Sequence, residues 1–288
     1  MARGADLSQL DMATTLSQPA EDFAGTLAGK IAVTHRLPAK RLPDGRAMLN
    51  LACGTRMDWS WNNLDFSPYA RIRRHERFAR FLYRIGLMSH QRRARLQNVD
   101  PQIIRWNLRK GIPFSSETFD VVYHSHFLEH IDRESGAAFL GECYRVLRVG
   151  GILRVVVPDL RWLVLRYTEA LHALESGDLS RSEAHERAIY DLFDQMVRTE
   201  VSGVMEQTTW VRTLEQRIRP DAASAGELHR WMYDKHSLGR LLTRIGFRDV
   251  CDVSASASRV AGWNEFNLDT LEDGSPYKPE SLYVEALR

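Results

Sequence analysis

The chain has 288 residues, 44% of them hydrophobic, so it can bury a full core and fits one large domain better than two independent ones. Its formal net charge of +2 is too small to predict a polyanionic partner such as nucleic acid for the whole molecule. Three widely spaced cysteines suggest neither a disulfide framework nor a zinc site, and they indicate a reducing compartment.

The first 46 residues are a polar, weakly patterned lead-in. The prolines and glycine of LPAKRLPDG forbid a continuous helix there. This lead-in lacks the apolar core of a signal sequence, and no uncharged run in the chain approaches membrane-spanning length. We therefore expect a cytoplasmic protein without a transmembrane segment.

Residues 47–66 predict two short strands joined by a turn of small residues. The run AMLNLA suits a strand covered on both faces, and a second strand fits residues 61–66, with a carboxylate at Asp65. A nucleoside cofactor needs a close backbone approach at one end and an acidic acceptor for its ribose hydroxyls at the other. This stretch therefore predicts the entrance to a cofactor site.

A strongly basic segment follows. Residues 71–95 hold nine arginines and one acid, so the segment carries about +8 and the rest of the chain about −6. Two sets of side chains alternate at helical spacing, the apolar Phe78, Phe81, Leu82 and Ile85 and the basic Arg73, Arg77, Arg80 and Arg84. We expect an amphipathic helix ending at Gly86, then a short helix to Leu96. The basic stripe of the amphipathic helix would meet an anionic lipid surface, a phosphate-bearing acceptor or an acidic carrier protein, or it would simply be solvated.

Strands and helices alternate from residue 102 to residue 158. Strands fit residues 102–107, the run FDVVYHS and the run ILRVVVP. Between the last two, Asp132 can cap a helix that Gly150 and Gly151 would stop. The inward face of that helix would comprise Phe139, Leu140, Tyr144 and Leu147. This alternation predicts a parallel sheet with helices on both faces.

The chain then becomes helical from about residue 160 to residue 216. Helical patterns cover 161–175, 184–197 and 204–217 with no strand between them, which predicts a helical insertion over the carboxyl edge of the sheet. A helix at 237–247 and strands at 248–254 and 281–287 follow. The predicted fold class is α/β, a Rossmann-like, doubly wound, mostly parallel sheet with a helical insertion after the fifth strand.

Four segments in this order resemble one family, the class I S-adenosylmethionine-dependent methyltransferases of the type 11 group. They are LNLACG, NLDFSP, WNLRKGIPFSSETFDVVYHSHFLEHI and ECYRVLRVGGILRVVVPDL. The resemblance implies a methyltransferase domain at 47–288 after the 1–46 lead-in. Within it, 70–97 would be a basic helical insertion and 160–229 a lid and substrate region.

The resemblance also implies a set of cofactor-binding residues for S-adenosylmethionine. The turn residues Ala52, Cys53, Gly54 and Thr55 would lie along its methionine portion, Asp65 would accept from the ribose hydroxyls, and Asn107, Leu108 and Ser125 would complete the site. Trp106 would pack either on adenine or in the core.

The first turn departs from the family pattern. The usual Gly-x-Gly-x-Gly becomes Ala52, Gly54 and Arg56, so Arg56 would point to solvent or close over the cofactor carboxylate. Asp65 follows Gly54 by 65 − 54 = 11 residues, short of roughly 20 in dinucleotide-binding units, which argues against a nicotinamide oxidoreductase.

Histidines cluster where the fourth strand would open toward the site. Alternation places His124 and His126 on one side, and His130 follows His126 by one helical turn. Glu129 lies beside them. We expect no metal, because neither an HExxH pattern nor a clear third ligand accompanies the two histidines.

The catalytic candidates are His126, His130 and Asp159, with capping and orientation as their alternative roles. A second cluster, His229, Arg230, Trp231 and Tyr233, would line the acceptor pocket or form a packed helix junction.

These residues predict methyl transfer to a small molecule, a sugar, or a glycolipid or carrier-bound intermediate. A neutral hydroxyl benefits from a general base, so the histidines favour O-methylation. The alternative is a non-catalytic methyltransferase-fold module for binding or assembly, suggested by the weakened glycine turn and Asn107.

Overall fold

The computed structural model describes residues 36–66, 75–86, 88, 90–97, 99, 102–196 and 229–288. Three predicted features lie outside the described residues, namely most of the lead-in, the start of the basic segment at 67–74 and the helix over 204–217.

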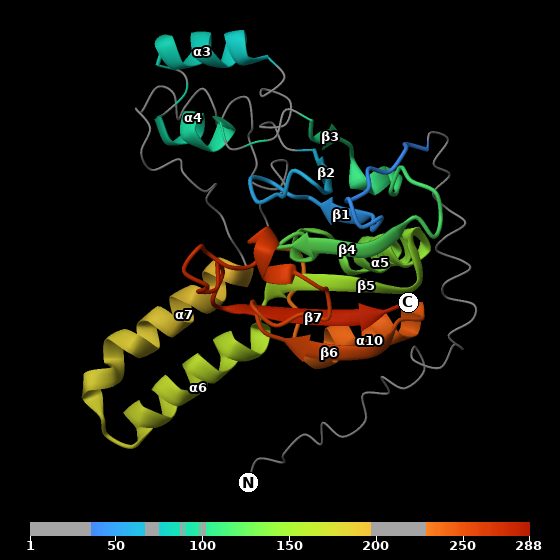
Figure 1. Ribbon diagram of the computed structural model, residues 1–288. Helices are drawn as coiled ribbons and strands as arrows, with labels where there is room; N and C mark the ends of the chain where they lie inside the picture. The colour runs from blue at the N-terminus through green and yellow to red at the C-terminus, as the bar shows by residue number, and fades with distance from the viewer. Residues whose placement is uncertain are drawn as a thin grey trace.

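A seven-stranded sheet in the order β3-β2-β1-β4-β5-β7-β6 forms the centre of the molecule (Figure 1). The first five strands are parallel and β7 lies antiparallel to its two neighbours. Their bounds are β1 Met48–Leu51, β2 Asn62–Asp65, β3 Ile104–Arg105, β4 Phe119–Ser125, β5 Leu147–Pro158, β6 Arg248–Val253 and β7 Ser281–Leu287. The predicted fold class is confirmed. Strand order reverses between β1 and β4, where ligands bind in open α/β sheets.

The two faces of the sheet are covered differently. Helices α5 (Arg133–Val146) and α10 (Lys235–Ile245) cover one face, and Leu140 and Leu242 pack there against the strands. The loop between β6 and β7 covers the other face, with its single turn η4 (Trp263–Phe266). In the described chain, the expectation of helices on both faces therefore holds for one face only. The second core consists largely of aromatic side chains, among them Trp61, Tyr123 and Trp263.

Helix α5 begins as predicted and ends earlier. The Asp132 carboxylate accepts a hydrogen bond from the Ser135 amide at 2.9 Å, which caps the helix. The helix ends at Val146, so the prediction that Gly150 and Gly151 stop it is wrong. Both glycines lie in the irregular start of β5, where the register with β4 shifts. Gly150 has a φ of +76°, a conformation that glycine adopts without strain.

Helices α3 (Glu76–Arg84) and α4 (His90–Gln97) lie apart from the sheet (Figure 1). A small cluster of Ala79, Met88 and Leu96 joins them. The predicted apolar face is oriented differently from expectation, because Phe78, Phe81 and Ile85 are 53%, 54% and 45% exposed. Ala79 and Leu82 face the cluster instead, so three large apolar side chains remain on the surface.

Helices α6 (Leu160–Glu175) and α7 (Ser182–Met196) form the predicted helical insertion after β5, joined by the turn η3 (Leu179–Arg181). The pair starts at the carboxyl end of β5 and projects away from the sheet (Figure 1). Arg166 donates to Asp191 across the pair at 2.9 Å. Because 197–228 lie outside the described residues, the lid role of 160–229 stays a prediction. Among the described helices, none is both long and apolar enough to cross a membrane.

Candidate functional site

A cavity of about 230 Å³ opens at the carboxyl ends of β1 and β4, the place where the strand order reverses. We call it the switch-point pocket. Its lining comes from three distant parts of the chain, listed here in order: Asn50, Ala52, Cys53, Gly54, Thr55, Arg56, Tyr123, Ser125, His126, Leu268, Tyr277 and Lys278. Six of the residues predicted from sequence, 52–55, Ser125 and His126, therefore line one pocket.

The turn after β1 has the geometry that a close ligand approach requires. Ala52 and Gly54 have φ values of +52° and +55°, and the Gly54 amide donates to Oδ2 of Asp65 at 2.8 Å. A Cβ at Gly54 would meet no atom within 4 Å, so this side of the turn is open. Asp65 is buried at the end of β2 and fixes the turn, although it is not part of the pocket lining.

Asn50 is a pocket residue that the sequence interpretation missed. It is 1% exposed, and its Nδ2 donates to the Arg56 carbonyl and to Oδ1 of Asn63 at 3.0 and 3.1 Å. Its own Oδ1 is buried and has no hydrogen-bond partner among the described residues. Because burying an unsatisfied acceptor is costly, this oxygen is suited to a ligand donor such as an ammonium group.

Arg56 is partly buried and lines the pocket rather than pointing to solvent. Its guanidinium lies 4.1 Å from the centre of the Tyr277 ring and donates to the Thr270 carbonyl at 2.6 Å. It therefore links the turn after β1 to the β6–β7 loop. Through this contact, and through Leu268, Tyr277 and Lys278, the loop provides one wall of the switch-point pocket.

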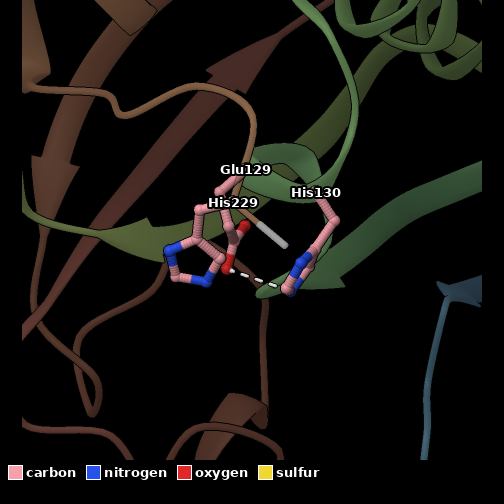
Figure 2. A group of neighbouring side chains, drawn as sticks. All are labelled: Glu129, His130 and His229. Carbon is pink, nitrogen blue, oxygen red and sulfur yellow. Dashed lines mark ion pairs between the residues drawn. The ribbon is translucent and has the colours of Figure 1, made fainter. Parts of the chain in front are cut away.

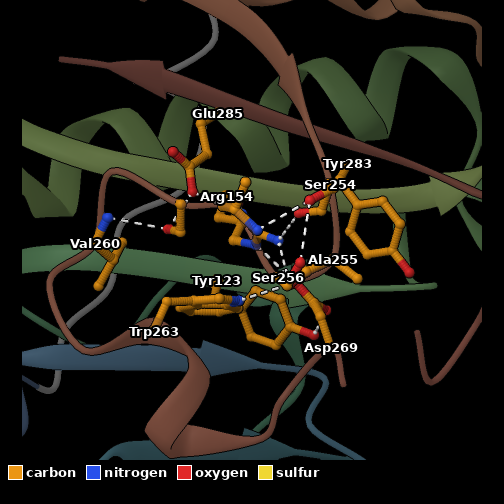
Figure 3. Close-up of polar contacts among 12 residues, drawn as sticks. Tyr123, Arg154, Ser254, Ala255, Ser256, Val260, Trp263, Asp269, Tyr283 and Glu285 are labelled. Atoms are coloured by element: carbon orange, nitrogen blue, oxygen red, sulfur yellow. Dashed lines mark hydrogen bonds and ion pairs between the residues drawn. The ribbon is translucent and has the colours of Figure 1, made fainter. Parts of the chain in front are cut away.

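A buried ion-pair network holds that loop on the sheet (Figure 3). Arg154 in β5 is fully buried, and its side chain donates to Asp269 and Glu285 at 2.7 Å each. Its other N–H groups reach the carbonyls of Ser254, Ala255 and Ala257. Tyr123 in turn donates to Oδ1 of Asp269 at 2.6 Å. An arginine inside the apolar run ILRVVVP and a glutamate inside SLYVEAL were the sequence signal for this network.

His124 and His126 differ in environment. His124 is fully buried against Phe139 of α5, and neither ring nitrogen has a hydrogen-bond partner in the part of the chain described. Burial lowers its pKa from 6.5 to about 4, so the ring is neutral. The strand ends at Ser125, and His126 has a φ of +49°, which interrupts the alternation expected to place both rings on one side.

His126 lies in the pocket wall with two partners. Its Nε2 is 2.8 Å from the Ser281 hydroxyl, and its Nδ1 is 3.3 Å from Oε1 of Glu129. Burial lowers the pKa of His126 below 6.5, although Glu129 acts in the opposite direction. Burial alone would raise the pKa of Glu129, but His126 and His130 outweigh it and the pKa is lowered. A buried carboxylate thus orients the His126 imidazole in the pocket.

Other predicted residues lie outside the pocket lining. Asn107 caps η1 (Leu108–Lys110) by accepting from the Arg109 amide at 3.0 Å, and Leu108 packs in the core. Trp106 donates to the Gly111 carbonyl and packs on the same core. Asp159 caps α6 by accepting from the Arg161 amide at 3.0 Å. The alternative capping role of Asp159 is therefore observed, and Asn107 likewise caps a short turn of helix.

The 229–233 segment lies beside η2 (Leu128–His130) rather than in the pocket lining. The amides of Arg230 and Trp231 donate to the Glu129 carbonyl, and the rings of His130 and His229 are 4.8 Å apart. Tyr233 is buried and pairs with Asp159 in a short bridge.

A sheet of order 3-2-1-4-5-7-6 with an antiparallel β7, and a pocket at its switch point, define the class I methyltransferase fold. Residues 64–155, from β2 into β5, match the type 11 family model described as a methyltransferase domain. The chain carries this domain and is an S-adenosylmethionine-dependent methyltransferase.

Two solved structures match most of the chain, at low identity and low TM-score. A SAM-dependent methyltransferase from Archaeoglobus fulgidus is 13% identical, with 94% of this chain and 95% of that chain covered and a TM-score of 0.35. An S-adenosylmethionine-dependent methyltransferase from Mesorhizobium loti is 14% identical, with coverage of 88% and 94% and a TM-score of 0.37. Identities and TM-scores this low do not discriminate among functions. No curated protein matches the chain.

Proposed function

We propose that the protein methylates a hydroxyl oxygen of a small molecule, a sugar, or a glycolipid or carrier-bound intermediate. The observation that carries this proposal is His126, a partly buried imidazole in the wall of the pocket that also holds the open turn at Gly54. Amines and carboxylates need mainly orientation, whereas a neutral hydroxyl benefits from a base with a pKa near that of histidine.

The described residues fit the cofactor that the family requires. The turn at 52–55 offers close backbone approach, the unsatisfied Oδ1 of Asn50 would accept from the cofactor's ammonium group, and Asp65 at the end of β2 would serve the ribose. When bound, S-adenosylmethionine supplies a methyl group already activated by its sulfonium. The cavity is smaller than pockets that enclose a whole ligand, so part of the cofactor would extend past it toward Asp65.

His126 would act as the base and Glu129 as the residue that positions it. The Nε2 atom of His126 is within hydrogen-bond distance of one hydroxyl, that of Ser281, which an acceptor hydroxyl would replace or use as a relay. The Glu129 carboxylate would stabilise the imidazolium that forms as the proton arrives. Asp159 caps α6 and has no part in this scheme.

Calorimetry tests cofactor binding. We expect S-adenosylmethionine and S-adenosylhomocysteine to bind with micromolar affinity, and Asp65→Ala to abolish binding because it removes both the ribose acceptor and the anchor of the Gly54 amide. Asp65→Asn, which keeps the side-chain shape, should weaken binding at least about tenfold. Asp252→Asn, which changes a 61% exposed carboxylate on β6, is the control and should bind normally. Full affinity in both Asp65 variants would remove this residue from the site.

A radiolabelled methyl screen against sugars, lipids and carrier-bound intermediates tests the acceptor. We expect label on oxygen, and His126→Gln should lower kcat about 10² to 10⁴-fold while cofactor affinity is kept. Transfer to nitrogen or carbon would contradict the O-methylation proposal. Cofactor binding without transfer to any acceptor would favour the non-catalytic module.

A further inference from the structure

Glu129, His130 and His229 bring three metal-ligating side chains together beside the switch-point pocket. Their ligand atoms all lie within 4.8 Å of one another, and Oε1 of Glu129 is 3.9 Å from Nε2 of His130. Figure 2 shows the two imidazoles on either side of the carboxylate. Sequence spacing does not connect the three residues, because His229 is 99 residues beyond His130.

The carboxylate of Glu129 is an unusual group to bury. It is fully buried, and neither oxygen has a hydrogen bond of normal geometry in the described residues. Its Oε1 atom forms ion pairs with His126 and His130, at 3.3 and 3.9 Å. Buried charges in proteins are paired or coordinate metal ions, so the position is suited to a cation.

His229 is held at this place by the backbone around it. The Arg230 and Trp231 amides donate to the Glu129 carbonyl at 2.6 and 3.3 Å. The Leu160 amide donates to the Tyr233 carbonyl at 3.0 Å, which fixes the far end of the segment to the start of α6. The third potential ligand is therefore set against the other two by main-chain contacts.

We propose that Glu129, His130 and His229 bind a divalent transition-metal ion. Two imidazoles and one carboxylate are the donors that Zn²⁺, Fe²⁺, Mn²⁺ and Co²⁺ accept, whereas Mg²⁺ and Ca²⁺ prefer oxygen. Ligand bonds of about 2.1 Å place two ligands of one tetrahedral ion about 3.4 Å apart, so small side-chain rotations close the observed distances. The ion supplies a positive charge that pairs with the buried Glu129 carboxylate.

The site adjoins the reaction site through one side chain. His126 lines the pocket, and its Nδ1 is 3.3 Å from Oε1 of Glu129. Three protein ligands leave at least one coordination position open, as in catalytic sites. In a role that rests on the proposed function, the ion would orient the acceptor oxygen and acidify its hydroxyl. The proton would pass to His126 while the acceptor oxygen bonds the methyl carbon, and the carbon–sulfur bond would break with its electron pair on sulfur.

Titration of the chelator-treated full chain with Co²⁺, followed by its visible absorption, tests the site directly. We expect saturation at one equivalent, displacement of Co²⁺ by Zn²⁺, and much weaker binding of Mg²⁺ measured by calorimetry. His130→Ala, His229→Ala and Glu129→Gln should each weaken Co²⁺ binding at least about tenfold. The control is His172→Ala, because His172 pairs with Glu175 at 3.5 Å on the exposed face of α6 and should not contribute.

Circular dichroism identifies variants that fail to fold, and His229→Gln, which keeps a polar side chain of similar length, replaces the alanine variant if needed. The proposal is overturned by the absence of saturable binding, or by folded variants that bind Co²⁺ like the unchanged chain. Cofactor calorimetry on the metal-free protein reports separately on the proposed function. Metal binding without cofactor binding would support the site and remove its role in methyl transfer.

Discussion

At the scale of single residues, neighbouring histidines differ because of what surrounds them. His124 is enclosed by the core at Phe139, whereas His126, two residues later, reaches the pocket and contacts Glu129 and Ser281. The sequence placed both at the same sheet edge but could not distinguish them, since a positive φ at residue 126 has no signal in a single sequence. The two rings therefore have different roles: His124 is a buried neutral group, and His126 is a candidate base.

His124 predicts a loss of stability in acid. Its pKa is about 4 when folded and 6.5 when exposed, so below pH 6.5 the unfolded state binds a proton that the folded state does not. Stability is therefore full above pH 6.5 and falls toward pH 4, by about 3 kcal/mol in total. Between pH 7.5 and pH 5, the free energy of unfolding should fall by about 2 kcal/mol less in His124→Leu than in the unchanged protein. Denaturant unfolding at the two pH values measures this difference. An equal loss in both proteins would show that His124 titrates normally.

The turn after β1 shows the same dependence on surroundings. The sequence correctly indicated that 52–55 form a tight turn at the site, because a buried run is followed by small residues. Ala52 has a left-handed conformation, which explains why the family pattern has glycine there and why alanine, with a single Cβ, is tolerated at a cost of about 1–2 kcal/mol.

At the scale of elements, α3 is the least expected part of the structure. Phe78, Phe81 and Ile85 are about half exposed, and Arg77 and Arg84 on the same helix are exposed too. Helical spacing predicted the amphipathic pattern but not which face would be buried. The small side chain of Ala79 allows α4 to pack closely, so the large apolar residues remain outside.

This arrangement predicts that α3 binds anionic membranes. Exposed aromatic side chains beside arginines are typical of helices that lie at a lipid interface. Co-sedimentation should show binding to vesicles of phosphatidylglycerol but not of phosphatidylcholine alone, and the double change Phe78→Ser/Phe81→Ser should remove it. Phe193→Ser on α7, where Phe193 is 66% exposed, is the matched control. Binding to acidic carrier proteins and not to vesicles would assign the basic face to a protein partner.

The β6–β7 loop is the element that sequence patterns did not reveal. Residues 254–280 have no strand or helix periodicity, yet they cover one face of the sheet and supply a wall of the pocket. Their contacts with Arg154 span 100 to 115 residues of sequence. Pairings over such distances leave no local periodicity, whereas the strands and the β1 turn were predictable from adjacent residues.

At the scale of the whole molecule, Arg154 joins parts that are distant in sequence. Arg154→Met would leave Asp269 and Glu285 buried without their cation, so the free energy of unfolding should fall by about 3–5 kcal/mol. Arg166→Met, which breaks the partly exposed pair with Asp191, should cost about 1 kcal/mol or less. Denaturant unfolding of both variants makes the comparison. Similar losses of unfolding free energy in the two variants would mean that the buried Arg154 network stabilises the fold no more than a surface ion pair.

Pocket residues come from three stretches of chain, around positions 50, 125 and 270, and β7 inserts between β5 and β6 after all of them. During translation the ribosome must therefore release the chain through residue 287 before the last wall can close. Until then, a nascent chain has the turn at Gly54 but no enclosed place for a ligand. Newly made protein would thus acquire affinity in a single late step, after synthesis has passed this point.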